Sequence, residues 1–323
     1  EVVHHPFFIF QKKHNKMLKK THLSFFFIHY FYFIIKPKNI MKKITFLALL
    51  LCYGFSSAQK IDHFEMIPLK GFYTNPVVSP NGEYLLLTGE HLKGVYLMDT
   101  KTQKIKQITT SEGAGYGYSW NPDSETIYYR LKEEGDYYAN AKIIAYNLKT
   151  ETKKGVSIES AKFLPNFKGE KTTENLVSID YETLQLQVSK INDLKTTKTL
   201  TNDQGAYFHP IVSNDGKKVA VHNGADIWVY SLDGQTNPIK VGSGLASTWS
   251  AGDKYILGYL DESNDGHIVS NSDLYLFDIE NQKTIKITDT EIIAEMHPTM
   301  HNNIIYYADD KSGRILMSKL NLK

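Results

Sequence analysis

The sequence predicts an all-β fold, a six-bladed β-propeller whose blades are four-stranded antiparallel sheets. Three observations predict it. A turn motif followed by an apolar strand recurs along the chain, a second hairpin pattern follows each copy, and successive copies start about 37–51 residues apart. Propeller repeats are typically about 40–50 residues long. Six such units account for residues 59–323 as a single propeller domain.

Each unit opens with a hairpin pattern. In the clearest copy, Asn75–Gly82 (NPVVSPNG) precedes the strand Glu83–Thr88 (EYLLLT). Asn and Asp tolerate left-handed backbone and Gly supplies positive φ, so such sequences form turns between strands. Further copies begin at Tyr118, His209, Thr248 and His297.

The second hairpin of each unit supplies two more strands. Val95–Asp99 (VYLMD) and Leu274–Asp278 (LYLFD) are apolar at nearly every position, and each is followed by a polar turn and a shorter strand. Strands that are apolar on both faces are typical of sheets covered on both sides. Neighbouring blades of a propeller provide that cover.

Two parts of the chain depart from the repeat pattern, the segment between residues 157 and 203 and the last unit. Between residues 157 and 203 the turn motif is weak, yet four strands of a divergent blade can be placed at Phe163–Pro165, Leu176–Ile179, Leu184–Ile191 and Thr197–Leu200. The last unit ends without a fourth strand, whereas Phe64–Leu69 (FEMIPL) precedes the first unit. We therefore expect Phe64–Leu69 to complete the last blade and close the ring, which removes an exposed sheet edge.

Residues 41–58 have the pattern of a signal peptide. Two lysines precede the apolar run Ile44–Phe55, and small residues end at Ala58, so cleavage would leave Gln59 as the new N-terminus. The apolar run is shorter than the roughly 20 residues that span a bilayer, so a retained anchor is the less favoured alternative. A lipoprotein is a further alternative because of Cys52, but Leu51 is larger than the residue expected before a lipidated cysteine.

Residues 1–40 combine lysines with aromatic and aliphatic clusters. We interpret them as upstream sequence that is mis-assigned to the protein, with translation starting at Met41. A longer targeting segment that starts at Met17 is the alternative. Residues 1–58 hold nine of the 37 basic and one of the 35 acidic residues, so residues 59–323 carry a net charge of −6. An acidic surface repels phosphate, which argues against a nucleic-acid partner.

The repeat resembles a known family. Pro-x-Val-Ser-Pro-Asn-Gly from Pro76, followed by Tyr-Leu-Met-Asp from Tyr96 and Ile-x-x-Ile-Thr from Ile105, is similar to the WD40-like repeat called PD40. Six such units after a signal peptide resemble the propeller domain of TolB. The resemblance implies a periplasmic or secreted binding protein, without the separate TolB N-terminal domain, because only about 15 residues separate Gln59 from the first motif.

Three residues occupy equivalent positions at the start of the innermost strand. Asn75, His209 and His297 would lie near one mouth of the central channel, where propellers often bind ligands. Neutral imidazole is a common metal ligand and proton carrier. The alternative is structural: His-Pro simply begins a strand, with the ring packed or hydrated.

A calcium-like loop is the second candidate site. Asp261, Ser263 and Asp265 supply oxygen side chains at positions 1, 3 and 5, and Gly266 permits the sharp turn at position 6. The acid expected at position 12 is displaced to Asp273. A solvated loop between strands is the alternative, and no cofactor other than this calcium is expected.

Two functions follow from these observations. The favoured one is a non-enzymatic, monomeric scaffold that binds a protein or cell-envelope component and has no stable membrane span after signal cleavage. The alternative is a propeller-based carbohydrate-active enzyme, similar to a lyase, with a His-lined channel mouth. The chain has no G-x-S-x-G, P-loop or H-E-x-x-H motif.

Overall fold

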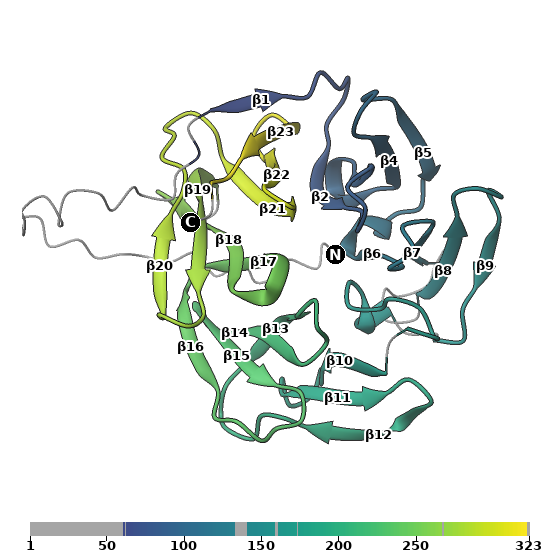
Figure 1. Ribbon diagram of the computed structural model, residues 1–323, viewed down its shortest axis with the longest axis vertical. Helices are drawn as coiled ribbons and strands as arrows, with labels where there is room; N and C mark the ends of the chain where they lie inside the picture. The colour runs from purple at the N-terminus through teal and green to yellow at the C-terminus, as the bar shows by residue number, and fades with distance from the viewer. Residues whose placement is uncertain are drawn as a thin grey trace, which may run out of the picture. The chain divides into compact units, whose positions relative to one another are not determined.

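Six small antiparallel sheets follow one another around a centre, as Figure 1 shows for the computed structural model. The structure describes residues 61, 63–132, 141–158, 161–172, 174–266 and 268–321. The predicted upstream extension (1–40) and signal peptide (41–58) lie outside these residues. Within the described ranges, no helix has the length and apolar character needed to cross a membrane. The predicted propeller fold is confirmed.

The strands of each blade run in chain order from the centre to the rim. The first two blades contain β2 (Thr74–Val78), β3 (Tyr84–Thr88), β4 (Val95–Asp99) and β5 (Ile105–Thr109), then β6 (Tyr118–Trp120), β7 (Thr126–Leu131), β8 (Lys142–Asn147) and β9 (Lys153–Gly155). The next two contain β10 (Asn175–Ile179), β11 (Leu186–Lys190) and β12 (Asp193–Thr199), then β13 (Tyr207–Val212), β14 (Lys218–Asn223), β15 (Asp226–Ser231) and β16 (Ile239–Ser243). The last two contain β17 (Leu245–Trp249), β18 (Tyr255–Ser263), β19 (Val269–Asp278) and β20 (Lys283–Lys286), then β21 (Glu295–His301), β22 (Ile304–Asp309) and β23 (Arg314–Lys319). Short 3₁₀ turns lie in the connections at η1 (Glu90–Leu92), η2 (Ala114–Tyr116), η4 (Ala161–Phe163) and η5 (Ala251–Asp253).

The hydrophobic core is divided among the interfaces between blades. Among the described residues, six buried apolar clusters occur, and each joins two neighbouring blades around the ring. In β3, Leu85 and Leu87 pack toward the last blade while Leu86 packs toward the second. Successive strand residues point to opposite faces. A strand buried on both faces therefore needs apolar residues at consecutive positions, as the sequence has.

Adjacent inner strands are tied together by side chains. The indole N–H of Trp120 donates to the carbonyl of Val77 at 3.1 Å, and that of Trp249 donates to the carbonyl of Ile211 at 2.9 Å. Both tryptophans end an inner strand and reach the inner strand of the preceding blade. These bonds give the carbonyl groups a hydrogen-bond partner and link the inner strands of adjacent blades.

The N-terminal strand closes the ring, as predicted. β1 (Phe64–Met66) pairs antiparallel with β23, with Phe64 opposite Ser318 and Met66 opposite Leu316. Figure 1 shows β1 as the outermost strand of the last blade. The strand is shorter than the predicted Phe64–Leu69, although the N–H of Ile67 still donates to the carbonyl of Ile315 at 2.9 Å.

The third blade corrects one prediction. Phe163–Pro165 was predicted as its inner strand, but the described residues of this blade form only three strands. Instead, η4 precedes a cis bond between Leu164 and Pro165. The N–H groups of Leu164, Asn166 and Phe167 donate to nearby carbonyls within this turn, so they are not available to a strand ladder. The side chain of Asn166 contacts the inner strand of the next blade, β13. It donates to the carbonyl of Pro210 and accepts from the N–H of Val212.

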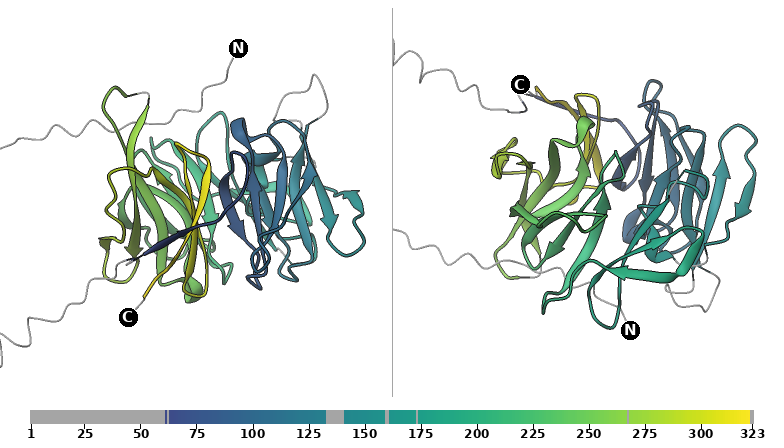
Figure 2. Two further views of the ribbon diagram at one scale, coloured as in Figure 1. Left: turned by 90° about the horizontal axis from the view of Figure 1, so that it is seen from above. Right: turned by 60° about the horizontal axis from the view of Figure 1, so that its bottom comes forward.

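The inner strands all begin on one face of the ring, which we call the mouth face. It also carries the connections from each outer strand to the next blade and from each second strand to the third. The hairpin of β18 and β19 is the longest of these, and its yellow-green tip extends beyond the neighbouring blades in the left view of Figure 2.

Candidate functional site

The three predicted mouth residues share an unusual backbone. Asn75, His209 and His297 have φ angles of 50°, 48° and 52°, and each precedes a proline. Each also lies within a register shift between the inner strand and its neighbour. Left-handed backbone at a residue other than glycine costs free energy, and such positions occur often at functional sites. The structure thus shows that the three positions are equivalent, while their role in ligand binding stays a prediction.

Asn75 links the first blade to the second. Its side-chain amide donates to the carbonyl of Gly115 at 3.3 Å, and its own carbonyl accepts a hydrogen bond from the hydroxyl of Tyr118. Both partners lie at the start of the second blade. The contacts made by Asn75 therefore hold two blades together at the mouth.

His209 lies beside a second histidine that the sequence analysis missed. His222 is the next-to-last residue of β14 and is fully buried, with its ring centroid 6.0 Å from that of His209 and 4.9 Å from the stacked ring of Phe208. Its Nε2 accepts the N–H of Ala246 at 3.2 Å, which places the proton on Nδ1. That Nδ1 is buried and has no hydrogen-bond partner within the described part of the chain. Burial, and then the nearby His209, lower the pKa of His222 to about 3, so the ring is neutral at pH 7.

His297 belongs to a separate group of titratable side chains. Its Nδ1 lies 3.4 Å from the hydroxyl of Tyr259, whose ring meets the imidazole edge-on at 5.3 Å. Burial lowers the pKa of His297 to about 4. Burial also raises the pKa of Tyr259 well above its usual range. Both groups are therefore neutral near pH 7.

Two carboxyl groups complete this group. Asp261 and Asp310 both raise the pKa of Tyr259 by their charge, and Asp261 lies two residues after Tyr259 on the same face of β18. Burial raises the pKa of each carboxyl group, and for Asp310 the charge of Asp309 adds to the effect. The four residues come from the fifth and sixth blades. We call Tyr259, Asp261, His297 and Asp310 the mouth cluster.

The mouth cluster has the chemistry of proton transfer or polar recognition. A carboxyl group with a raised pKa can hold a proton closer to neutral pH, and a neutral imidazole can accept one. Groups with perturbed pKa values that gather in one place indicate a functional site. Tyr259 and Asp310 were missed from the sequence because Tyr259 lies within the second strand of its blade and Asp310 directly follows one, where no motif marks them.

The predicted calcium ligands are placed differently from a calcium loop. Asp261 lies in β18 opposite Ser272, whereas Ser263 and Asp265 bond to each other at 3.1 Å near the hairpin tip. Asp273 forms an ion pair with Lys286 at 2.8 Å. No group of three or more His, Cys, Asp or Glu that could hold a metal ion occurs among the described residues. Calcium binding stays a prediction.

Exposed apolar side chains concentrate on the mouth face. Ile292 is 81% exposed, and Tyr181 and Ile268 are each 70% exposed, which makes them the most exposed large apolar residues that the structure describes. Tyr181 lies between β10 and β11, Ile268 at the tip between β18 and β19, and Ile292 between β20 and β21. All three connections belong to the mouth face.

Comparison with solved structures supports the fold. A putative TolB from Agrobacterium tumefaciens is 13% identical with a TM-score of 0.51, and the match covers 78% of this chain and 91% of that chain. The propeller domain of Cps50 (Swd1) from Myceliophteria thermophila is 11% identical with a TM-score of 0.54, covering 81% and 100%. TolB from Acinetobacter baumannii is 14% identical with a TM-score of 0.46, covering 76% of this chain and 54% of that chain, so this chain spans about half of its length.

No protein-family model and no curated protein matches the sequence. Identities of this size concern the fold alone, because one fold supports many functions. The repeat pattern, the six blades and the match to the Agrobacterium structure agree with one another. The chain therefore has a TolB-like six-bladed propeller fold.

Proposed function

We propose that this chain is an exported, monomeric and non-enzymatic propeller that binds a protein or cell-envelope partner on its mouth face. One observation carries the proposal: the most exposed large apolar side chains of the described residues, Ile292, Tyr181 and Ile268, all lie on mouth-face connections. Scattered exposed apolar residues are normal on a protein surface. Their concentration on the loops of one face supports a role in partner binding.

The charge of residues 59–323 supports the same proposal. Their net charge of −6 disfavours nucleic acid. Export rests on the signal-peptide pattern of residues 41–58. N-terminal sequencing of the protein isolated from cells tests export separately, since a processed protein should begin at Gln59.

Site-specific photo-crosslinking tests the mouth face as the binding face. A photoreactive residue replaces Ile292 or Ile268 in one pair of variants. Matched controls carry it at Ile105 or Ile239, which are each 36% exposed and start outer strands near the opposite face. The proposal expects one discrete crosslinked partner from the mouth-face positions in intact cells. Equal adducts from both faces would contradict it.

The mouth cluster favours a second candidate function, a carbohydrate-active enzyme. His297, Asp261 and Asp310 would supply proton transfer, and His209 would face the same mouth. Incubation with polysaccharides that contain uronic acids, followed by product analysis, tests this function. Turnover should disappear in His297→Gln and Asp310→Asn and persist in an exposed control such as Asp289→Asn. Absence of turnover in the unmodified protein would reject the enzyme.

The calcium proposal has its own test. A melting temperature that rises on adding calcium and falls back on chelation would support a site, and Asp265→Asn should then abolish the rise. An identical melting temperature in calcium and in chelator would reject it.

A further inference from the structure

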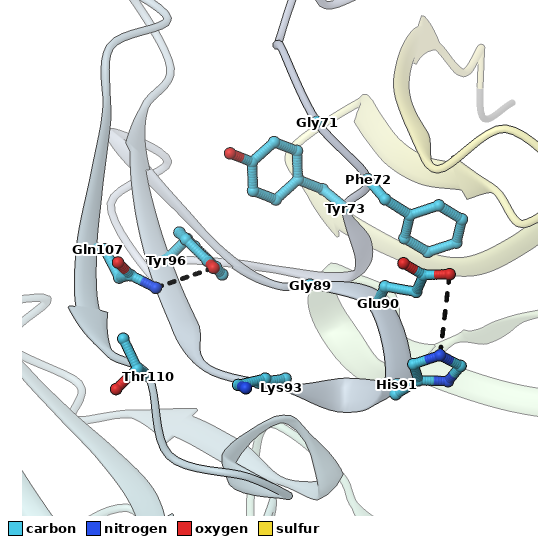
Figure 3. Close-up of a pocket in the computed structure, with 10 residues that line it drawn as sticks. All are labelled: Gly71, Phe72, Tyr73, Gly89, Glu90, His91, Lys93, Tyr96, Gln107 and Thr110. Atoms are coloured by element: carbon cyan, nitrogen blue, oxygen red, sulfur yellow. Dashed lines mark hydrogen bonds and ion pairs between the residues drawn. The ribbon is translucent and has the colours of Figure 1, made fainter.

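A pocket of about 400 Å³ lies at the outer part of the mouth face, where the connection from β1 to β2 passes the loop between β3 and β4. Figure 3 shows Phe72 and Tyr73 from the connection, Glu90, His91 and Lys93 from the loop, and Tyr96 from β4 around this space. The volume falls within the range of small-molecule sites, roughly 300–1,000 Å³. The pocket is separate from the mouth cluster, and neither function proposed above uses it.

The aromatic walls of the pocket are held in place. The rings of Tyr73 and Tyr96 meet edge-on at 5.2 Å, and the hydroxyl of Tyr96 accepts a hydrogen bond of 2.9 Å from the amide of Gln107. Phe72 packs directly over Gly313, because a Cβ atom added there would approach Phe72 Cδ2 to 2.2 Å. A binding site that is already ordered loses less entropy when a ligand arrives.

The loop that forms the other wall is held in an unusual conformation. His91 and Leu92 both have φ of 56°, in the left-handed region. The N–H of Leu92 donates to the carbonyl of Gly89 at 3.1 Å, and the N–H of Lys93 donates to that of Glu90 at 3.2 Å. Left-handed backbone at two successive residues is unfavourable and persists only where the surrounding structure holds it. The loop therefore presents Glu90, His91 and Lys93 from a fixed turn.

The polar groups of the pocket differ in sign and kind. Among the described residues that line the pocket, Lys93 is the one lysine or arginine. Its ammonium forms no ion pair with any carboxylate that the structure describes. Gln107 offers an amide and Thr110 a hydroxyl. The carboxylate of Glu90 lies 3.8 Å from Nε2 of His91, and both side chains are largely exposed. The pocket thus combines aromatic surfaces, uncharged donors and acceptors, and one unpaired cation.

We propose that this pocket binds a sugar that carries a carboxylate, such as a uronic acid residue. The apolar face of a sugar ring packs against aromatic side chains, which have flat apolar surfaces and polar edges. Its hydroxyl groups both donate and accept, as the amide of Gln107 and the hydroxyl of Thr110 do, and the carboxylate of Glu90 can accept from them. Its carboxylate accepts a charge-assisted hydrogen bond from the ammonium of Lys93. A phosphate-rich ligand fits less well, because its larger negative charge is repelled by Glu90 more strongly than a single carboxylate is.

Calorimetric titration of the full chain with glucuronate and with glucose tests the proposal. The two sugars differ in the carboxylate, so glucuronate should bind and glucose should bind at least about tenfold more weakly. Lys93→Met should remove this preference. Lys101→Met is the matched control, since Lys101 is an exposed lysine in the turn between β4 and β5 on the opposite face. Tyr96→Leu should weaken both sugars, and thermal melting of each variant confirms that it folds.

Three results would overturn the proposal. The first is no glucuronate binding at millimolar concentration. The second is equal binding of glucuronate by the Lys93→Met variant and the unmodified protein. The third is equal binding of acetate, which would mean that a carboxylate is recognised without a sugar. None of these results depends on the protein or envelope partner proposed above, so the two proposals fail separately.

Discussion

Glu295 is a buried carboxyl group whose ionisation should weaken the fold. It starts β21, has no exposed surface, and accepts hydrogen bonds from the hydroxyls of Thr288 and Thr290. Burial, and then the charge of Asp273, raise its pKa from 4.5 to about 7 against the effect of those hydrogen bonds. Asp273 itself is held by the ammonium of Lys286 at 2.8 Å. The folded protein therefore keeps the Glu295 proton to a higher pH than the unfolded chain does.

Glu295→Gln removes this ionisation while keeping the shape of the side chain. A raised pKa in the folded state means that stability is complete below pH 4.5 and falls as the pH rises to about 7. Each pKa unit corresponds to about 1.36 kcal/mol, so the loss amounts to at most about 3 kcal/mol. The Glu295→Gln variant does not lose this stability, because glutamine does not ionise. Its free energy of unfolding relative to the unmodified protein should rise by up to about 3 kcal/mol between pH 4 and pH 8.

Urea unfolding followed by tryptophan fluorescence measures this difference at a series of pH values. Glu291→Gln is the matched control, because Glu291 is exposed in the same connection. Subtracting each variant from the unmodified protein cancels the titration of all other groups. A Glu295→Gln difference that stays constant from pH 4 to pH 8 would refute the reasoning, since it would mean that Glu295 titrates alike in both states.

Three further predictions concern the scaffold. Burial lowers the pKa of His222 to about 3, so stability should be lost as the pH falls from 6.5 toward 3, and His222→Gln should reduce that loss in urea unfolding at pH 7 and pH 4. Trp249→Phe leaves the carbonyl of Ile211 without its indole donor and should cost about 1–3 kcal/mol in the same assay. Removal of residues up to Met66 exposes the edge of β23 and should produce self-association, visible as an earlier peak in size-exclusion chromatography.

Most of the fold could be predicted because each copy of the repeat contains the sequence signals for its strands and turns. A strand buried on both faces needs consecutive apolar residues, and a tight turn needs Asn, Asp or Gly, so both leave clear marks in the sequence. The closing strand could be found for the same reason, since Phe64–Leu69 matched a position that the last unit lacked, and Phe64–Met66 of this segment pairs with β23. The third blade differed because the N–H groups after η4 bond locally within a turn, and the side chain of Asn166 contacts the inner strand of the next blade instead.

Less of the candidate site could be predicted, because it is assembled from positions far apart in the chain. The repeat aligned Asn75, His209 and His297, since each occupies the same position in its own unit. It gave no sign of His222 or Tyr259. His222 reaches the mouth from the second strand of the same blade as His209, and Tyr259 from the second strand of the blade before that of His297. Their pKa values depend on burial between blades, a property of packing that local sequence does not carry.

The two faces of the ring are under different constraints, and this difference favours the mouth face for recognition. On the opposite face, the turns after the inner strands bind one another: the N–H of Asn81 donates to the hydroxyl of Ser124 at 3.0 Å, and Asn214 bonds to the carboxylate of Asp253 at 2.8–2.9 Å. A turn that must form hydrogen bonds with the turn of the neighbouring blade cannot vary freely in sequence or length. Mouth-face connections range from the two residues between β14 and β15 to the long hairpin of β18 and β19. Loops that vary on a rigid scaffold are where binding specificity arises, so partner contacts should lie on the mouth face.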